Sequence, residues 1–147
     1  MSTPAIRVAF MCVQNAGRSQ MATAFAQQER QKRGLTDEVE ILTGGTHPAD
    51  AVHEVVIEVM EDKGFDLSDR TPREITTAEL ESCDYVATMG CSTLELDADN
   101  STVDVRDWAL DDPDGKDLAE ARNIRDTVRQ RVQALFDEIE REMNKDE

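Results

Sequence analysis

The chain has 147 residues, a length that predicts a single domain over residues 1–147 with one sizeable core. Its 32 acidic residues outnumber its 16 basic residues along the whole sequence, and the formal net charge is −16. This balance argues against a nucleic-acid partner, because a phosphate backbone needs a positive surface. We interpret it as adaptation to high internal salt, since at about 1 M salt a Debye length of about 3 Å screens self-repulsion. The melting temperature should therefore rise with KCl concentration.

The sequence carries no sign of export or of a membrane anchor. No apolar stretch approaches the roughly 20 residues that span a membrane, and no apolar core with a cleavage site marks a signal peptide. Three cysteines without a Cys-x-x-Cys pair favour free or catalytic thiols in a reducing compartment. Two histidines without paired cysteines give no metal site. We expect a cytoplasmic protein with no bound metal and no membrane partner.

Apolar patterning predicts strands that alternate with helices. In chain order the predicted elements are a strand at 6–11, a helix at 19–33, a strand at 39–43, helices at 51–63 and 72–82, strands at 85–89 and 103–105, and a helix at 118–143. Gly34 and Gly64 are expected to end the helices that precede them. The alternation predicts an α/β fold of three layers, a four-stranded parallel sheet with helices on both faces.

Ligands of parallel sheets bind beyond the carboxyl ends of the strands. Cys12 follows the first predicted strand, Cys91 follows the third, and Asp111 and Asp112 follow the fourth. All of these chemical groups should therefore lie at the same edge of the sheet. Cys83 precedes the third strand, so we expect it at the opposite edge as a small core residue.

The loop after the first strand combines a nucleophile with anion-binding groups. Cys12 lies where a strand turns directly into a helix, whose free N–H groups and dipole favour an anion and a thiolate. Arg18 can hold two oxygens of a tetrahedral anion, Ser19 can donate to the thiolate, and Gly17 permits a tight backbone. The predicted oxyanion-binding residues are Val13, Gln14, Asn15, Ala16, Gly17 and Arg18.

Residues 12–19 resemble the signature of the low-molecular-weight protein tyrosine phosphatase fold, whose members carry it near the N-terminus. From the residues alone, Asp112-Pro113 is either a general acid on a loop or an ordinary turn. The resemblance implies that Asp112 is the acid, with Asp111 as the close competitor. It extends from Ile6 to about Val132.

Several segments resemble the arsenate reductases that share this fold rather than its tyrosine phosphatases, which carry Arg-Ser-Pro and Asp-Pro-Tyr. These segments are residues 18–22, 46–48, 64–68, 108–111 and 112–116. The resemblance implies a Cys12–arsenic adduct, Cys91 as the resolving thiol, and regeneration by a thioredoxin- or glutaredoxin-like partner or a small thiol. The chain departs from the thioredoxin-linked pattern because residues 92–100 contain no further cysteine.

Two other functions stay open on the sequence. A phosphomonoester or tyrosine phosphatase would use the same Cys12, Arg18 and Asp112 with water as the second nucleophile. A non-catalytic oxyanion-binding module would need only the loop.

Some individual residues also carry expectations. Asn15 and Asp66 resemble residues that hold potassium in some relatives, or else they bond the loop backbone. His53 is expected on the solvent side of its helix, and Tyr85 and Trp108 are expected to be packing residues.

Overall fold

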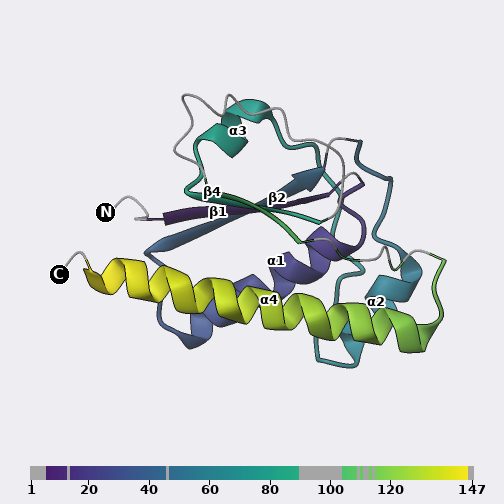
Figure 1. Ribbon diagram of the computed structural model, residues 1–147. Coiled ribbons are helices and arrows are strands. Elements are labelled where there is room, and N and C mark those ends of the chain that lie inside the picture. The colour runs from purple at the N-terminus through teal and green to yellow at the C-terminus, as the bar shows by residue number, and fades with distance from the viewer. Residues whose placement is uncertain are drawn as a thin grey trace.

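The computed structural model describes residues 6–12, 14–45, 47–89, 104–108, 110, 113 and 115–145. Strands and helices alternate along these residues as the pattern predicts (Figure 1). The elements are β1 (Ile6–Cys12), α1 (Arg18–Lys32), β2 (Val39–Gly45), α2 (Glu54–Glu61), α3 (Thr77–Glu81), β3 (Tyr85–Thr88), β4 (Asp104–Asp107) and α4 (Leu118–Lys145). No helix in this described part of the chain is long and apolar enough to cross a membrane.

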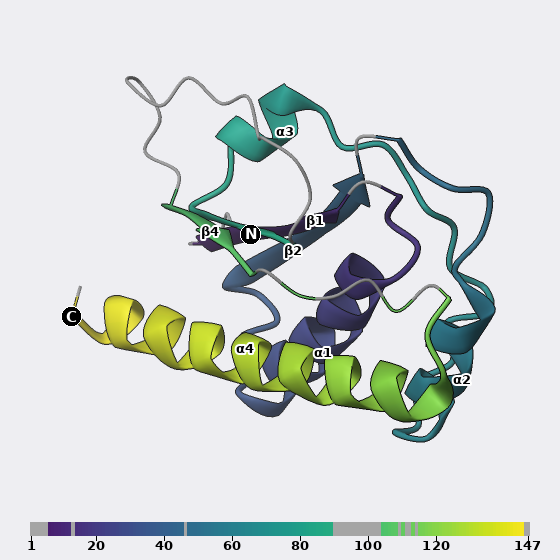
Figure 2. The same ribbon diagram turned by 45° about the vertical axis from the view of Figure 1, so that its right-hand side comes forward.

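The four strands form one parallel sheet in the order β2-β1-β3-β4, which confirms the predicted fold class. Helices α1, α2 and α4 lie on one side of the sheet and α3 lies on the other, so the fold has three layers (Figures 1 and 2). Cys12 pairs in register with Gly45, so the carboxyl ends of β1 and β2 reach the same edge. Both termini of the described chain lie away from that edge in Figure 1.

Alternation along β1 divides the core between the two faces of the sheet. Val8, Phe10 and Cys12 belong to the larger apolar cluster, which the long helices cover. Ala9 and Met11 belong to a smaller cluster on the α3 side of the sheet, together with Ile75, Leu80, Cys83 and Val86. Burial on both faces explains why β1 reads as a continuous apolar run rather than as an alternating one. The strand is therefore a rigid base for the loop that follows it.

The structure corrects the bounds of three predicted elements. The predicted helix at 72–82 is reduced to α3, because Thr76 forms a capping box with Glu79 and residue 74 bridges to Gly45. The predicted helix at 51–63 begins only at Glu54, with His53 as its N-cap residue. The predicted strand at 103–105 is shifted toward the carboxyl side, to β4, which is an edge strand with little apolar character.

Two glycine positions show why the chain turns or approaches closely where it does. Gly34 has φ +68° and lies just beyond α1, as predicted for a residue that ends a helix. Gly44 lies inside β2, and a Cβ there would fall 2.4 Å from Cβ of Ile75. Only glycine therefore lets the segment before α3 pack against β2.

Candidate active site

The candidate site lies at the carboxyl end of β1, where the chain turns into α1 (Figures 1 and 2). Cys12 is the last residue of the strand and is 3% exposed. Its Sγ lies 3.0 Å from Oγ of Ser19, and the backbone N–H of Asn15 donates to it at 3.2 Å. An N–H can act only as a donor, so the sulfur accepts the hydrogen bond from Asn15. The two contacts fix the position of the sulfur at the start of the loop.

Asn15 holds the loop in shape. Its φ of +51° places it in the left-handed region, which asparagine adopts more readily than most residues, and it is fully buried. Its Nδ2 donates to Oγ of Ser19 at 2.8 Å and to Oγ1 of Thr43 at 2.9 Å. Its Oδ1 accepts from Nε2 of Gln20 at 3.1 Å and from the backbone N–H of Arg73 at 3.1 Å. One side chain thus ties the loop to α1, to β2 and to the segment before α3.

Sequence reasoning missed three of these supporting residues. Thr43, Gln20 and Arg73 carry no motif of their own. Thr43 and Arg73 reach the loop because β1 pairs with β2 and residue 74 bridges to Gly45, and Gln20 reaches it from the first turn of α1. Gln20 also donates to the backbone oxygen of Asn15 at 3.0 Å. Gln20 is 2% exposed. A buried polar residue needs a hydrogen-bond partner, so a polar residue in the first turn of a buried helix is the signal that could have identified Gln20.

The amino end of α1 faces the loop. Gly17 occupies the N-cap position without a side-chain cap, and the first turn contains no acidic residue. The helix dipole at this end favours an anion. Arg18 is the first residue of the helix, and its Nη1 donates to the backbone oxygen of Leu110 at 2.6 Å. The arginine thus joins the oxyanion loop to the segment after β4.

His53 lies beside the loop, so its expected place on the solvent side of a helix is wrong. The helix starts one residue later, and the backbone N–H of His53 donates to the oxygen of Ala16 at 3.0 Å. A Cβ added at Gly17 would lie 3.6 Å from Cδ2 of His53 and 3.3 Å from Cγ of Pro113. A histidine and the proline after Asp112 therefore flank the same glycine.

Four of the predicted site residues lie outside the described residues. They are Val13 of the oxyanion loop, the proposed resolving thiol Cys91, and the two candidate acids Asp111 and Asp112. Their neighbours are described: Leu110 and Pro113 both reach the amino end of α1. Trp108 is 6% exposed and its ring packs on Phe10 at a centroid distance of 5.9 Å, which confirms the expected packing role.

Cys83 lies at the other end of the sheet, one residue before the turn into β3, and is 3% exposed. Its Sγ donates to the backbone oxygen of Glu79 at 3.3 Å. Burial raises the pKa of Cys83 to about 11, with the nearby Asp84 and Glu40 carboxylates adding to the shift. The residue therefore stays a protonated core thiol at neutral pH, as predicted.

Asn15 and Asp66 are both engaged within the protein. Asp66 is exposed, and its Oδ1 accepts from the backbone N–H of Ser68 at 2.9 Å and from its Oγ at 2.5 Å. The Ser68 donors hold the pKa of Asp66 below its ordinary value. Among the residues that the structure describes, no group of three or more His, Cys, Asp and Glu is arranged to hold a metal ion.

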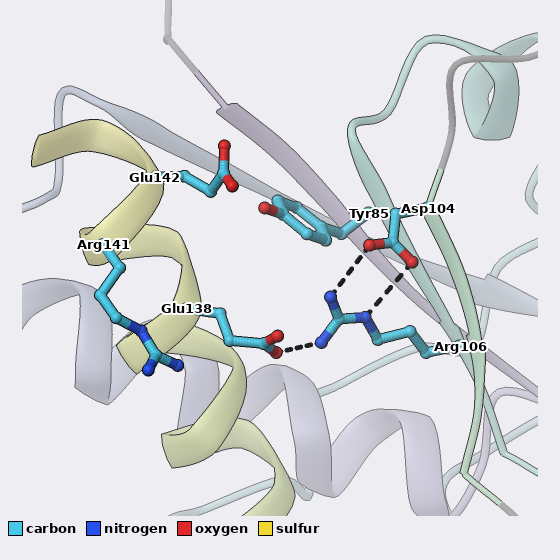
Figure 3. A pocket seen from close by; sticks show the side chains of 6 residues that line it. All are labelled: Tyr85, Asp104, Arg106, Glu138, Arg141 and Glu142. Carbon is cyan, nitrogen blue, oxygen red and sulfur yellow. Dashed lines mark hydrogen bonds and ion pairs between the residues drawn. The ribbon is translucent and has the colours of Figure 1, made fainter. Parts of the chain in front are cut away.

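A second polar pocket of about 270 Å³ lies at the amino edge of the sheet, away from the loop. Tyr85 and Asp104 begin β3 and β4 there, and Glu138, Arg141 and Glu142 come from α4 (Figure 3). Arg106 points between Asp104 and Glu138, which raise the pKa of its guanidinium, and it stacks over Tyr85. Because the carboxylates of Asp104, Glu138 and Glu142 also line it, this pocket is unfavourable for an oxyanion.

Comparison with known proteins places this geometry in a family. The model of the family "Low molecular weight phosphotyrosine protein phosphatase" matches residues 7–145. A Halobacterium salinarum protein named "Putative arsenate reductase" is 72% identical over 130 residues, which cover 88% of this chain and 90% of that protein. The glutaredoxin arsenate reductase of a Synechocystis species is 33% identical over 135 residues, covering 90% of this chain and 98% of that protein.

Solved structures agree with the sequence relatives. An arsenate reductase in the phosphate-binding state matches with a TM-score of 0.77 and 31% identity, covering 91% of this chain and 98% of the other. A thioredoxin-dependent arsenate reductase of Corynebacterium glutamicum matches with a TM-score of 0.72 and 29% identity, covering 95% of this chain and 64% of that one. The halophilic source of the first sequence relative fits the acidic composition.

Proposed function

The chain belongs to the low molecular weight phosphotyrosine protein phosphatase family, and we propose that within it the protein is an arsenate reductase. The observation that carries the proposal is the environment of Cys12, whose sulfur meets Ser19 Oγ and the Asn15 N–H at the amino end of α1. The loop itself would accept any tetrahedral oxyanion. The choice of arsenate over phosphate esters therefore rests on the 72% identical relative and on the matching structures.

The first chemical step forms a sulfur–arsenic bond. The Cys12 thiolate attacks arsenate that is held by the backbone N–H groups of residues 13–18 and by the Arg18 guanidinium. A hydroxyl leaves as water after Asp112, or its neighbour Asp111, protonates it. Ser19 and Asn15 keep the sulfur oriented throughout. The product is a Cys12–arsenate adduct with arsenic still in its oxidised state.

The second step reduces the arsenic. A second thiolate attacks the sulfur of Cys12, the sulfur–arsenic bond breaks, and its electron pair stays on arsenic, which leaves as arsenite. The two sulfurs are oxidised together to a disulfide, so two electrons have moved from thiols to arsenic. Cys91 is the proposed intramolecular thiol, and an external small thiol is the alternative. An external thiol reductant closes the cycle, and both a glutaredoxin-named and a thioredoxin-dependent relative support this requirement.

A phosphatase activity is the second candidate, and one observation favours it. Cys12, Ser19 and Arg18 form a cradle that would hold a phosphate ester as well as arsenate, and the family bears the name of a phosphatase. Water, in place of a thiol, would then attack the adduct and release phosphate from Cys12.

Two further points belong to the reductase proposal. The need for free thiols implies a cytoplasmic location, and potassium would bind near Asn15 and Asp66.

The test uses cysteine variants that allow only one intramolecular disulfide each. Cys83→Ser leaves Cys12 and Cys91, whereas Cys91→Ser leaves Cys12 and Cys83. Each reduced protein is incubated with arsenate at high KCl, and disulfides are mapped by mass spectrometry. We expect an arsenate-dependent Cys12–Cys91 bond in Cys83→Ser and none in Cys91→Ser. Turnover of an aryl phosphate without any arsenate-dependent thiol oxidation would assign the protein as a phosphatase.

A further inference from the structure

Four consecutive backbone carbonyls of the loop, those of residues 14–17, each accept a hydrogen bond from a residue outside 14–17. Backbone N–H groups donate to three of them: Ala49 to Gln14 at 2.9 Å, His53 to Ala16 at 3.0 Å and Met21 to Gly17 at 3.1 Å. The donor to the fourth is a side chain, because Nε2 of Gln20 lies 3.0 Å from the backbone oxygen of Asn15. A substitution at position 20 therefore removes one of these donors and leaves the backbone intact.

A held carbonyl also sets the direction of the next N–H group. In a trans peptide the carbonyl and the following N–H point to opposite sides, and no peptide bond among the described residues is cis. The peptide between Gln14 and Asn15 shows the consequence. Ala49 holds its carbonyl, and on the opposite side its N–H donates to Sγ of Cys12 at 3.2 Å. A donor behind the loop thus turns an N–H toward the nucleophile.

The side chain of Gln20 is fixed with its donor toward Asn15. Gln20 lies in the first turn of α1 and is 2% exposed. A backbone carbonyl can only accept, so the NH₂ group of the Gln20 amide must be the part that faces Asn15. The same Nε2 donates to Oδ1 of Asn15 at 3.1 Å, and the backbone N–H of Arg73 donates to that Oδ1 as well. One buried amide therefore holds both the backbone and the side chain of Asn15.

We propose that Gln20 is a positioning residue for anion binding, which holds the carbonyl of Asn15 behind the loop and thereby points the N–H of Ala16 toward the bound oxyanion. Thr43 and Arg73 contact only the side chain of Asn15, so their bonds do not replace this one. Without Gln20 the peptide between Asn15 and Ala16 is free to turn its carbonyl dipole toward the anion, in a chain whose net charge is already −16. The inference rests on the proposed function for where the anion binds, but not for which anion reacts.

The test compares Gln20→Met, which keeps the length of the side chain and removes the donor, with Gln27→Met as the matched control. Gln27 lies about two turns further along α1 and makes its own hydrogen bond, from Arg70 at 2.7 Å. Gln20→Ala is a second variant without the donor, so that loss of the hydrogen bond is separated from the fit of a methionine. All variants carry Cys83→Ser and Cys91→Ser, which leave Cys12 as the remaining thiol.

Three quantities are measured at high KCl. The dissociation constant for inorganic phosphate, determined by calorimetry, reports on the anion site. The rate of Cys12 alkylation by iodoacetamide at pH 7 reports on the nucleophile. The free energy of unfolding in urea reports on the fold as a whole, and the first two quantities are compared under conditions in which every variant is folded.

We expect Gln20→Met and Gln20→Ala to raise the dissociation constant for phosphate about tenfold, because an anion loses one well-aligned N–H donor. Alkylation of Cys12 should change little, because Ala49 still sets the N–H that reaches the sulfur and Asn15 still donates to Ser19. Gln27→Met should change neither quantity. The proposal is overturned if the two Gln20 variants bind phosphate as tightly as the control, or if alkylation of Cys12 changes as much as the affinity, which would indicate displacement of the whole loop.

Failure of the proposed function gives a different result. If the protein with its three cysteines binds phosphate but shows no arsenate-dependent thiol oxidation, the reductase assignment is wrong, and weaker phosphate binding by the Gln20 variants still supports the positioning role. Arsenate-dependent oxidation together with unchanged phosphate affinity in the Gln20 variants would leave the reductase assignment in place and remove the role of Gln20.

Discussion

Cys12 and Cys83 are equally buried, yet they lie at opposite ends of the same sheet. The sulfur of Cys12 accepts a backbone hydrogen bond, whereas the thiol of Cys83 donates one. Cys12 is the last residue of β1, and its sulfur accepts a hydrogen bond from the N–H of Asn15. Cys83 precedes the amino end of β3, and its thiol donates to the carbonyl of Glu79. Both are 3% exposed. Burial alone therefore does not separate the proposed nucleophile from the packing residue, whereas the backbone partner of each sulfur does: an N–H for Cys12 and a carbonyl for Cys83.

The surroundings of the two ends differ in the same way. At the carboxyl end, uncharged groups such as Asn15, Ser19 and Gln20 shape a loop that leaves the amino end of α1 available. At the amino end, Arg106 is paired with Asp104 and Glu138 around the second pocket. In a chain of net charge −16, an oxyanion site needs local positive potential. At the carboxyl edge, the dipole of α1 and the Arg18 guanidinium supply it.

Arg18→Lys should have the largest effect on this contrast. Lysine keeps the positive charge but loses the planar fork that holds two oxygens, and it cannot reproduce the contact with Leu110 in the same geometry. We expect the single-turnover rate with arsenate to fall about 100-fold. Arg106→Lys is the control at the amino edge, and it should leave that rate unchanged. Equal losses in the two variants would remove the distinction between the two ends.

Cys83 should react only at high pH in the folded protein. In the double variant Cys12→Ser/Cys91→Ser it is the remaining thiol, and its alkylation by iodoacetamide can be followed against pH. Because burial raises its pKa to about 11, the rate should stay low at neutral pH and rise as the pH approaches 11. In urea the profile should move toward lower pH, near the ordinary value of 9.0.

The same shift affects stability with a defined sign. The folded state holds the Cys83 proton more tightly than the unfolded state, so this contribution to stability is present below pH 9 and is lost as the pH rises toward 11. Rapid alkylation of the folded protein at pH 8 would show that Cys83 is not a buried protonated thiol.

Ser19→Ala tests how the hydroxyl beside Cys12 affects the reactivity of that cysteine. The variant removes the hydroxyl that lies 3.0 Å from the sulfur and also leaves Nδ2 of Asn15 without one of its acceptors. We expect alkylation of Cys12 at pH 7 to slow about tenfold, which corresponds to about 1.4 kcal/mol. Alkylation of Cys83 in the same sample is the internal control. If alkylation of Cys83 became faster in the variant, the change would report loosening of the fold rather than of the loop.

Glu79→Gln should have the smallest effect, and on stability alone. Glu79 belongs to the capping box of α3 and accepts from Arg73, whose donors hold its pKa below the ordinary value. The variant should lower the free energy of unfolding by about 1 kcal/mol at pH 7, measured by urea denaturation at fixed KCl. The stabilisation by Glu79 is present above the carboxyl's unfolded-state pKa and is lost as the pH falls through its lower folded-state value. An altered arsenate rate would contradict a purely structural role.

Local sequence predicted the fold class well, because a strand, a glycine-containing loop and a helix are encoded within residues 6–33. Hydrophobic runs also located the parallel strands in the correct order along the chain. The predicted bounds of a helix were wrong where a polar contact of the backbone outweighs the helix propensity of the residues. Pro72 suggested a helix start, whereas Thr76 and Glu79 form the cap that begins α3.

The parts of the site that sequence did not reveal are those brought in by tertiary pairing. Thr43 reaches Asn15 because β2 lies beside β1, and Arg73 does so because its segment bridges to the end of β2. His53 was misplaced because the predicted helix began three residues too early, which put it on a helix face instead of at a cap beside Gly17. None of these residues has a spacing that marks it.

The central claim is that Cys12 reduces arsenate and Cys83 takes no part. The most direct measurement is the initial rate of arsenite formation at high KCl with a small dithiol as reductant, with the rate of a protein-free sample subtracted. The account predicts that Cys83→Ser forms arsenite at the rate of the unaltered protein and that Cys12→Ser forms none above background. Arsenite formation by Cys12→Ser at the unaltered rate would contradict it.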